Sequence, residues 1–104
     1  MKTMLFALAA LMPLSCLAAY PIEVEKQLNG AEITYSTQDI DYNMGAISLT
    51  NGGATEATCT LVFRNGPEAP RTRKASIEPG KTVNLTAKFA RSIIRLRIQM
   101  TCGI

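Results

Sequence analysis

The chain has 104 residues, a formal net charge of +3 and hydrophobic residues at 47% of its positions, and it contains no histidine. Its length is that of one small domain. The absence of histidine excludes Ser-His-Asp and Cys-His catalysis and metal binding through imidazole. We therefore expect a protein that is not an enzyme and that needs no metal or cofactor.

The first nineteen residues have the pattern of a signal peptide. Lys2 supplies a positive charge, residues 4–14 form an unbroken apolar run, and small residues follow before Tyr20. A membrane-spanning helix needs about 20 apolar residues, so this run is too short to remain as an anchor. We expect a signal helix over residues 1–19, cleaved after Ala19 or, alternatively, after Ala18. Acylation of Cys16 is disfavoured because Pro13 stands where a lipoprotein signal has leucine.

Cleavage would leave two cysteines, Cys59 and Cys102, in a chain addressed to the periplasm or the outside of a Gram-negative cell. An even cysteine pair in an oxidising compartment predicts a disulfide, with two separate buried thiols as the alternative. Closing a loop of this length would stabilise the fold by roughly 4 kcal/mol in the loop-entropy account. The bond would therefore supply a large share of the stability of so small a domain.

Beyond residue 19, apolar and polar residues alternate, which is typical of strands with one buried face. The alternation predicts strands over residues 31–36, 47–50, 57–63, 74–78, 82–89 and 94–102. Residues 22–28 form either one more strand, paired with 31–36 through a turn at Asn29-Gly30, or a short helix.

Turn residues separate these segments. Asn51-Gly52-Gly53 and Asn65-Gly66-Pro67 tolerate the positive φ of tight turns, and Pro79-Gly80 suits the centre of a type II turn. Short strands with turns at such intervals predict an all-β fold, a small β-sandwich of six to seven antiparallel strands that forms a single domain over residues 20–104. Cys59 and Cys102 both fall on apolar faces, so their disulfide would lie in the core and could join the two sheets.

Three segments, residues 47–52, 57–63 and 77–85, resemble secreted immunoglobulin-like modules. In such modules a strand ending in Asn-x-Gly precedes a core strand, and Pro-Gly introduces the next strand. The likeness implies an immunoglobulin-like sandwich. The absence of tryptophan excludes a true antibody-type domain.

Residues 20–30, 57–60 and 63–71, with the basic segment that ends at Cys102, resemble a family of small exported proteins of uncharacterised function from pseudomonad-like bacteria. The likeness covers nearly all of residues 20–104 and implies no catalytic residue. Members of that family sometimes bear a phosphoglycerate kinase name. This chain has neither the size nor the phosphate-binding elements of such a kinase.

Charge is distributed unevenly along the predicted mature chain. Residues 20–56 carry six acidic residues against Lys26 alone, whereas residues 57–104 carry nine basic residues against two acidic ones. The basic half could bind an anionic partner such as an acidic protein, a lipid headgroup or a polysaccharide; the alternative is a solvated sheet face. Nucleic acid is not favoured, because no aromatic ladder accompanies the charges. The candidate anion-binding residues are Arg64, Arg71, Arg73, Lys74, Lys88, Arg95 and Arg97.

Two weaker motifs are better explained as turns. Gly80-Lys81-Thr82 resembles the end of a phosphate-binding loop, but Ala75 stands where that motif needs glycine and a strand follows instead of a helix. Asp39, Asp41 and Asn43 resemble the start of a calcium loop whose later ligands are missing.

The sequence leaves three functional hypotheses. The first is a non-enzymatic binding or accessory module that uses the basic face. The second is an envelope structural or assembly protein that acts through strand-edge pairing. The third is a small hydrolase that uses Asp39 and Asp41.

Overall fold

A computed structural model describes residues 20–104, and the expected signal peptide lies outside the described residues. The described chain forms seven strands and no helix. The strands are β1 (Ile22–Gln27), β2 (Ile33–Asp41), β3 (Met44–Asn51), β4 (Ala57–Arg64), β5 (Arg71–Ile77), β6 (Thr82–Lys88) and β7 (Leu96–Gly103). Residues 22–27 are thus a strand, which decides between the two alternatives for this segment.

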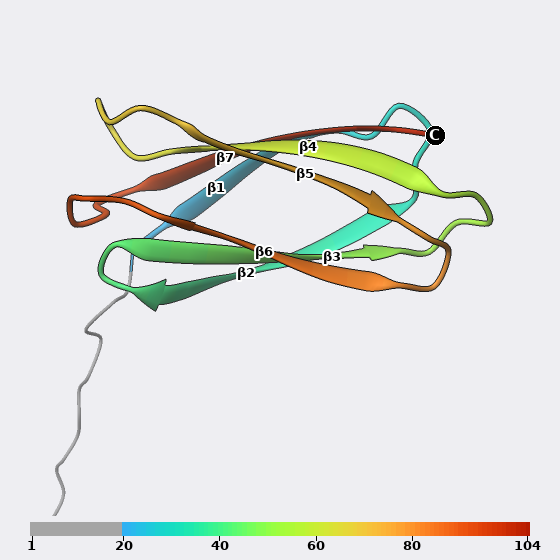
Figure 1. The fold of residues 1–104 in the computed structure, drawn as a ribbon, viewed down its shortest axis with the longest axis horizontal. Coiled ribbons are helices and arrows are strands. Elements are labelled where there is room, and N and C mark those ends of the chain that lie inside the picture. The colour runs from blue at the N-terminus through green and yellow to red at the C-terminus, as the bar shows by residue number, and fades with distance from the viewer. Residues whose placement is uncertain (1–19) are drawn as a thin grey trace, which may run out of the picture.

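The strands form two sheets that lie face to face (Figure 1). One sheet has the order β1-β7-β4-β5 and the other has the order β2-β3-β6. All neighbours are antiparallel except β1 and β7, which run parallel with Ile22 opposite Leu96. The expected all-antiparallel arrangement is therefore wrong at this one pair.

The expected hairpin through Asn29-Gly30 is also wrong, because β1 and β2 belong to different sheets. The turn itself is present. Asn29 and Gly30 have φ values of 50° and 90°, and the Ala31 amide donates to the Leu28 carbonyl (2.9 Å). The turn therefore carries the chain from one sheet to the other instead of joining neighbours within one sheet.

The core forms where the apolar phases of the strands face each other. Along β4 and β7 every second residue is buried, and β3 and β6 contribute from the opposite sheet. The largest fully buried side chains include Phe63, Phe89, Ile47, Leu49 and Met100. The predicted inward phase is confirmed for Cys59, Leu61, Ile98 and Cys102. It is wrong at Ile94, which precedes β7 and is 85% exposed.

The predicted disulfide joins Cys59 and Cys102. These residues lie directly opposite each other on the neighbouring strands β4 and β7. The bond is buried in the core, as the strand phases indicated, but it links two strands of one sheet. The expectation that it could join the two sheets is therefore wrong.

The turn predicted at Pro79-Gly80 is confirmed. The Lys81 amide donates to the Glu78 carbonyl (3.0 Å), and Gly80 has a φ of 77°. Gly80-Lys81-Thr82 therefore belongs to the connection between β5 and β6 and leads into a strand, so the interpretation as a turn instead of a phosphate loop holds.

Candidate functional site

The seven basic residues selected from the sequence do not form one patch. Arg64, Arg95 and Arg97 line one pocket, Arg71 and Arg73 lie against β6, and the two lysines lie elsewhere. Lys74 is exposed on β5, opposite Thr60 of β4, and Lys88 ends β6 opposite Met44. The single anion-binding surface expected from the sequence is therefore divided.

Arg71 and Arg73 are engaged in the fold. The Arg71 Nε donates to the Lys88 carbonyl (3.3 Å), and the Arg73 Nε donates to the Thr86 carbonyl (3.0 Å). The Arg71 guanidinium also lies 5.0 Å from the centre of the Phe89 ring. These contacts connect the two sheets where β5 and β6 lie side by side, and they occupy carbonyl groups at the outer edge of β6. Both arginines therefore have a structural role that accounts for their presence.

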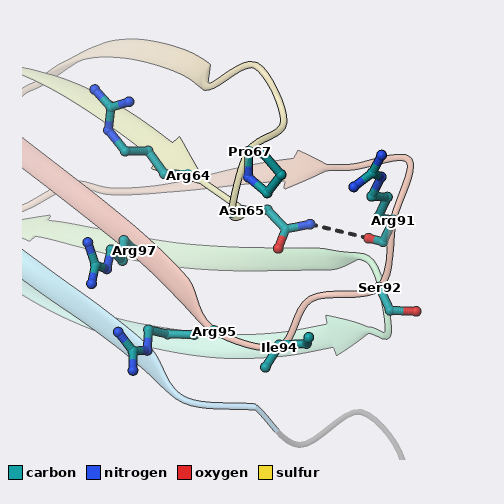
Figure 2. A pocket seen from close by; sticks show the side chains of 9 residues that line it. Arg64, Asn65, Pro67, Arg91, Ser92, Ile94, Arg95 and Arg97 are labelled. Carbon is teal, nitrogen blue, oxygen red and sulfur yellow. Dashed lines mark hydrogen bonds between the residues drawn. The ribbon is translucent and has the colours of Figure 1, made fainter.

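The remaining arginines define a feature that we call the arginine pocket. Its volume is about 470 Å³, within the range of small-molecule sites. Figure 2 shows its residues, which come from the end of β4, the β4–β5 connection, the β6–β7 connection and the start of β7. They are Arg64, Asn65, Gly66, Pro67, Arg91, Ser92, Ile94, Arg95 and Arg97.

Hydrogen bonds hold the two connections together around the pocket. The Asn65 side-chain amide donates to the Arg91 carbonyl (3.3 Å; Figure 2) and to Glu68 Oε2 (3.0 Å). The Glu68 carboxylate accepts from the backbone amides of Ala90 (3.0 Å) and Arg91 (3.1 Å). The β6–β7 connection is thus fixed to the β4–β5 connection, which places Arg91 in the lining of the pocket.

Glu68 remains ionised in this arrangement. Its desolvation raises the pKa of the carboxyl, but the two backbone amides, the Asn65 amide and the Arg71 guanidinium together outweigh that effect. The net result is a pKa below the ordinary value of 4.5. The carboxylate therefore serves as the anchor of the β6–β7 connection.

The arginines of the pocket differ in how far they are neutralised. The Nε atoms of Arg95 and Arg97 lie 3.6 Å and 3.7 Å from the carboxylate of Glu23 on β1. Arg64 instead donates to Gln99 Oε1 (3.2 Å). No carboxylate of residues 20–104 lies within 4.0 Å of the guanidinium of Arg64 or Arg91. The pocket therefore keeps a net positive charge.

Figure 2 shows that the four guanidinium groups are spread around the pocket and do not point at one common centre. A single small anion is bound best by donors that converge on it. Spread donors suit an extended anionic surface or several anionic groups at once.

Sequence reasoning missed two functional candidates here. Arg91 lies between two strand patterns and carried no periodic signal, although it is one of three arginines within seven residues. Ile94 was assigned to the buried face of the last strand. In the structure β7 begins at Leu96, so Ile94 precedes the strand and is exposed at the pocket.

The acidic residues proposed for a calcium loop or a hydrolase are not assembled into such a site. Asp41 Oδ1 accepts from the backbone amide of Tyr42 (2.7 Å). The Asn43 side chain is buried and donates to the Phe89 carbonyl (2.8 Å). In the part of the chain that the structure describes, no group of three or more acidic or cysteine residues is placed to hold a metal ion.

Comparisons with protein-family models, with curated proteins and with solved structures found no match to this chain. Within residues 20–104, there is no helix that is long and apolar enough to cross a membrane. The described chain is thus an all-β protein of two facing sheets, with a buried disulfide and a basic pocket at one end.

Proposed function

We propose that the protein is an exported, non-enzymatic binding or accessory module that contacts an anionic partner through the arginine pocket. The observation that carries this proposal is the presence of four arginines around one pocket, two of them without a carboxylate partner among residues 20–104. Uncompensated guanidinium groups attract anions and form charge-assisted hydrogen bonds with them.

The fold within this proposal is an immunoglobulin-like sandwich. Sheets of four and three strands, with connections that cross between them, support it. One feature distinguishes the chain from antibody-type domains: its disulfide lies within one sheet, whereas theirs joins the two sheets.

Export and the lack of enzymatic activity rest on the chemistry of the chain. The N-terminal apolar run has the length of a signal peptide, and a disulfide persists in oxidising compartments such as the periplasm. The chain has no histidine, and both cysteines of the described part are oxidised. The described part of the chain therefore contains neither a thiol nucleophile nor an imidazole base.

Charge reversal tests the proposed binding. Arg64→Glu with Arg91→Glu changes two arginines that have no carboxylate partner among the described residues, so the fold should tolerate the change. Capture of envelope components at low salt should be lost, and wild-type capture should weaken as salt is raised. Lys74→Glu with Lys81→Glu makes the same change in charge away from the pocket and should retain capture. Equal capture by both double variants would refute the proposal.

A second candidate function is strand-edge pairing with another protein through β2. Arginine side chains occupy the outer edge of β6, whereas β2 is an edge strand of nine residues, mostly exposed. The backbone of β2 is contacted at its end by the Tyr20 hydroxyl, which lies 3.0 Å from the Asp41 carbonyl. An exposed edge of this length can accept a further strand. Hydrogen exchange that shows β2 as protected as β6 in the isolated protein would contradict this candidate.

A further inference from the structure

The arginine pocket is part of a larger surface at one end of the sandwich. The β2–β3, β4–β5 and β6–β7 connections all lie at this end (Figure 1). The Ile93 amide donates to the Tyr42 carbonyl (2.7 Å), which places the β2–β3 turn against the β6–β7 connection. We call residues 40–43, 64–70 and 89–97 the loop end.

Exposed apolar side chains gather at the loop end. Ile94 is 85% exposed, Tyr42 is 54% exposed and Ile40 is 45% exposed. They are three of the five large hydrophobic residues that the described chain exposes. On the same connection, Ile93 is buried in the core, whereas the side chain of the next residue, Ile94, lies in solvent. Connections carry a disproportionate share of binding residues, so an exposed apolar side chain at the tip of one is a candidate for contact with a partner.

The surroundings of Ile94 indicate the chemistry of that partner. Arg91 and Arg95 lie on either side of it in the sequence, and Arg64 and Arg97 complete the pocket. Solvent-exposed guanidinium groups beside an apolar side chain are complementary to the surface of a bilayer, where anionic headgroups lie above the acyl chains.

From this geometry we infer that the loop end docks on an anionic lipid surface, with Ile94 at the level of the headgroups and the pocket arginines on lipid phosphates. The inference rests on the proposed function, since it names the anionic partner of the arginine pocket. The spread of the guanidinium groups fits an array of phosphates better than one ion (Figure 2). Asp39 and Asp41 lie on β2, so we expect the arginine side to face the lipid.

A tryptophan reporter tests the contact directly, because the chain contains no tryptophan. Ile94→Trp places an indole at the loop end. Ile104→Trp, at a position that is 71% exposed, places one at the C-terminus on the opposite end (Figure 1). The two variants share every other residue, including any retained leader. With vesicles that contain phosphatidylglycerol, the emission of the first variant should move to shorter wavelength and that of the second should not. Vesicles of phosphatidylcholine alone should shift neither.

Affinity measurements separate the two contributions. Arg91→Gln with Arg95→Gln should weaken vesicle binding roughly 25-fold, at about fivefold for each arginine. Ile94→Ser should weaken it roughly tenfold through lost apolar burial. Lys74→Gln with Lys81→Gln removes the same charge elsewhere and should bind as the wild type does.

Soluble polyglutamate distinguishes failure of this inference from failure of the proposed function. Arginine-dependent binding to polyglutamate, without binding to vesicles and without an effect of Ile94→Ser, would overturn the lipid inference and leave the anion-binding module standing, with an acidic protein as its partner class. Binding to neither probe would refute both. Equal spectral shifts at Ile94→Trp and Ile104→Trp would also overturn the lipid inference, because they would show that the contact is not made by the loop end.

Discussion

The backbone amide of Gly80 donates to the carbonyl of Asn51 (2.8 Å), and the backbone amide of Asn51 donates to the carbonyl of Lys81, the residue that follows Gly80 (3.1 Å). The end of β3 is thereby joined to the turn between β5 and β6. The Asn51 side chain adds donations to the carbonyls of Thr55 and Ile77 (both 2.8 Å) and accepts from the Gly53 amide (2.8 Å). One asparagine thus joins the β3–β4 and β5–β6 connections at the end of the sandwich opposite the arginine pocket.

We expect Asn51→Ala to destabilise the protein by at least about 2 kcal/mol. The residue is 1% exposed, and loss of its side chain leaves the buried Ile77 carbonyl and the part-buried groups of Thr55 and Gly53 without this partner. An unpaired buried group costs about 1–3 kcal/mol. Asn84→Ala, on the exposed face of β6, should change stability by less than about 1 kcal/mol. Chemical denaturation of both variants measures the difference. Similar losses in the two would show that the buried hydrogen bonds of Asn51 contribute little.

Gly45→Ala should also destabilise the fold. A methyl group at this position in β3 would overlap the buried side chain of Leu96. Forcing extra volume into a packed core typically costs about 1–3 kcal/mol. Gly103→Ala is the matched control, because no atom lies within 4 Å of the added carbon there. A thermal melt that gives both variants the same midpoint would contradict the packing described for Leu96.

Loss of the disulfide should lower stability by up to about 4 kcal/mol, because the bond closes a loop across 43 positions. Cys59→Ala with Cys102→Ala should therefore unfold at markedly lower denaturant concentration than the wild type. Mass spectrometry of the native protein checks the premise. Two thiols that alkylate without unfolding would show that the bond is absent, and an intact leader would contradict the proposed export.

The lowered pKa of Glu68 makes stability dependent on pH. A carboxyl whose pKa is lower in the folded than in the unfolded state stabilises the fold fully above its unfolded pKa. That contribution is lost as the pH falls through the folded pKa. We expect the melting temperature of the wild type to fall below about pH 4.5, and the fall to be smaller in Glu68→Gln, which cannot ionise. Parallel melting curves of the two proteins from pH 7 to pH 3 would mean that Glu68 does not contribute.

The sequence predicted the faces of the strands better than their partners. In β4 and β7 every second residue is apolar and faces the core, so the pattern itself identified the inward side chains of Leu61 and Ile98. Alternation contains no information on which strand lies alongside. The pairing of β1 with β7 and the disulfide within one sheet therefore could not be read from it.

The same limitation applies to the candidate site. Arg97 lies on the polar face of a predicted strand, whereas Arg73 lies just before the predicted strand 74–78, so the sequence alone gives neither of them a contact partner. Only the position of β6 beside β5 shows that Arg73 bonds to the Thr86 carbonyl, whereas Arg97 lines the pocket. Arg91 and Ile94 lie in a connection, where no periodic pattern exists and contacts between connections decide what is exposed.

The parallel pairing of β1 with β7 makes the first strand of the described fold dependent on the last. During synthesis or passage through a narrow channel, β1 emerges well before its partner, residues 96–101, because five other strands lie between them in the sequence. Cys102 must likewise be released before its bond to Cys59 can form. A nascent chain that stops before residue 96 thus has neither the neighbour of β1 nor the covalent link to Cys59, so the sandwich can close only after residues 96–102 have been released.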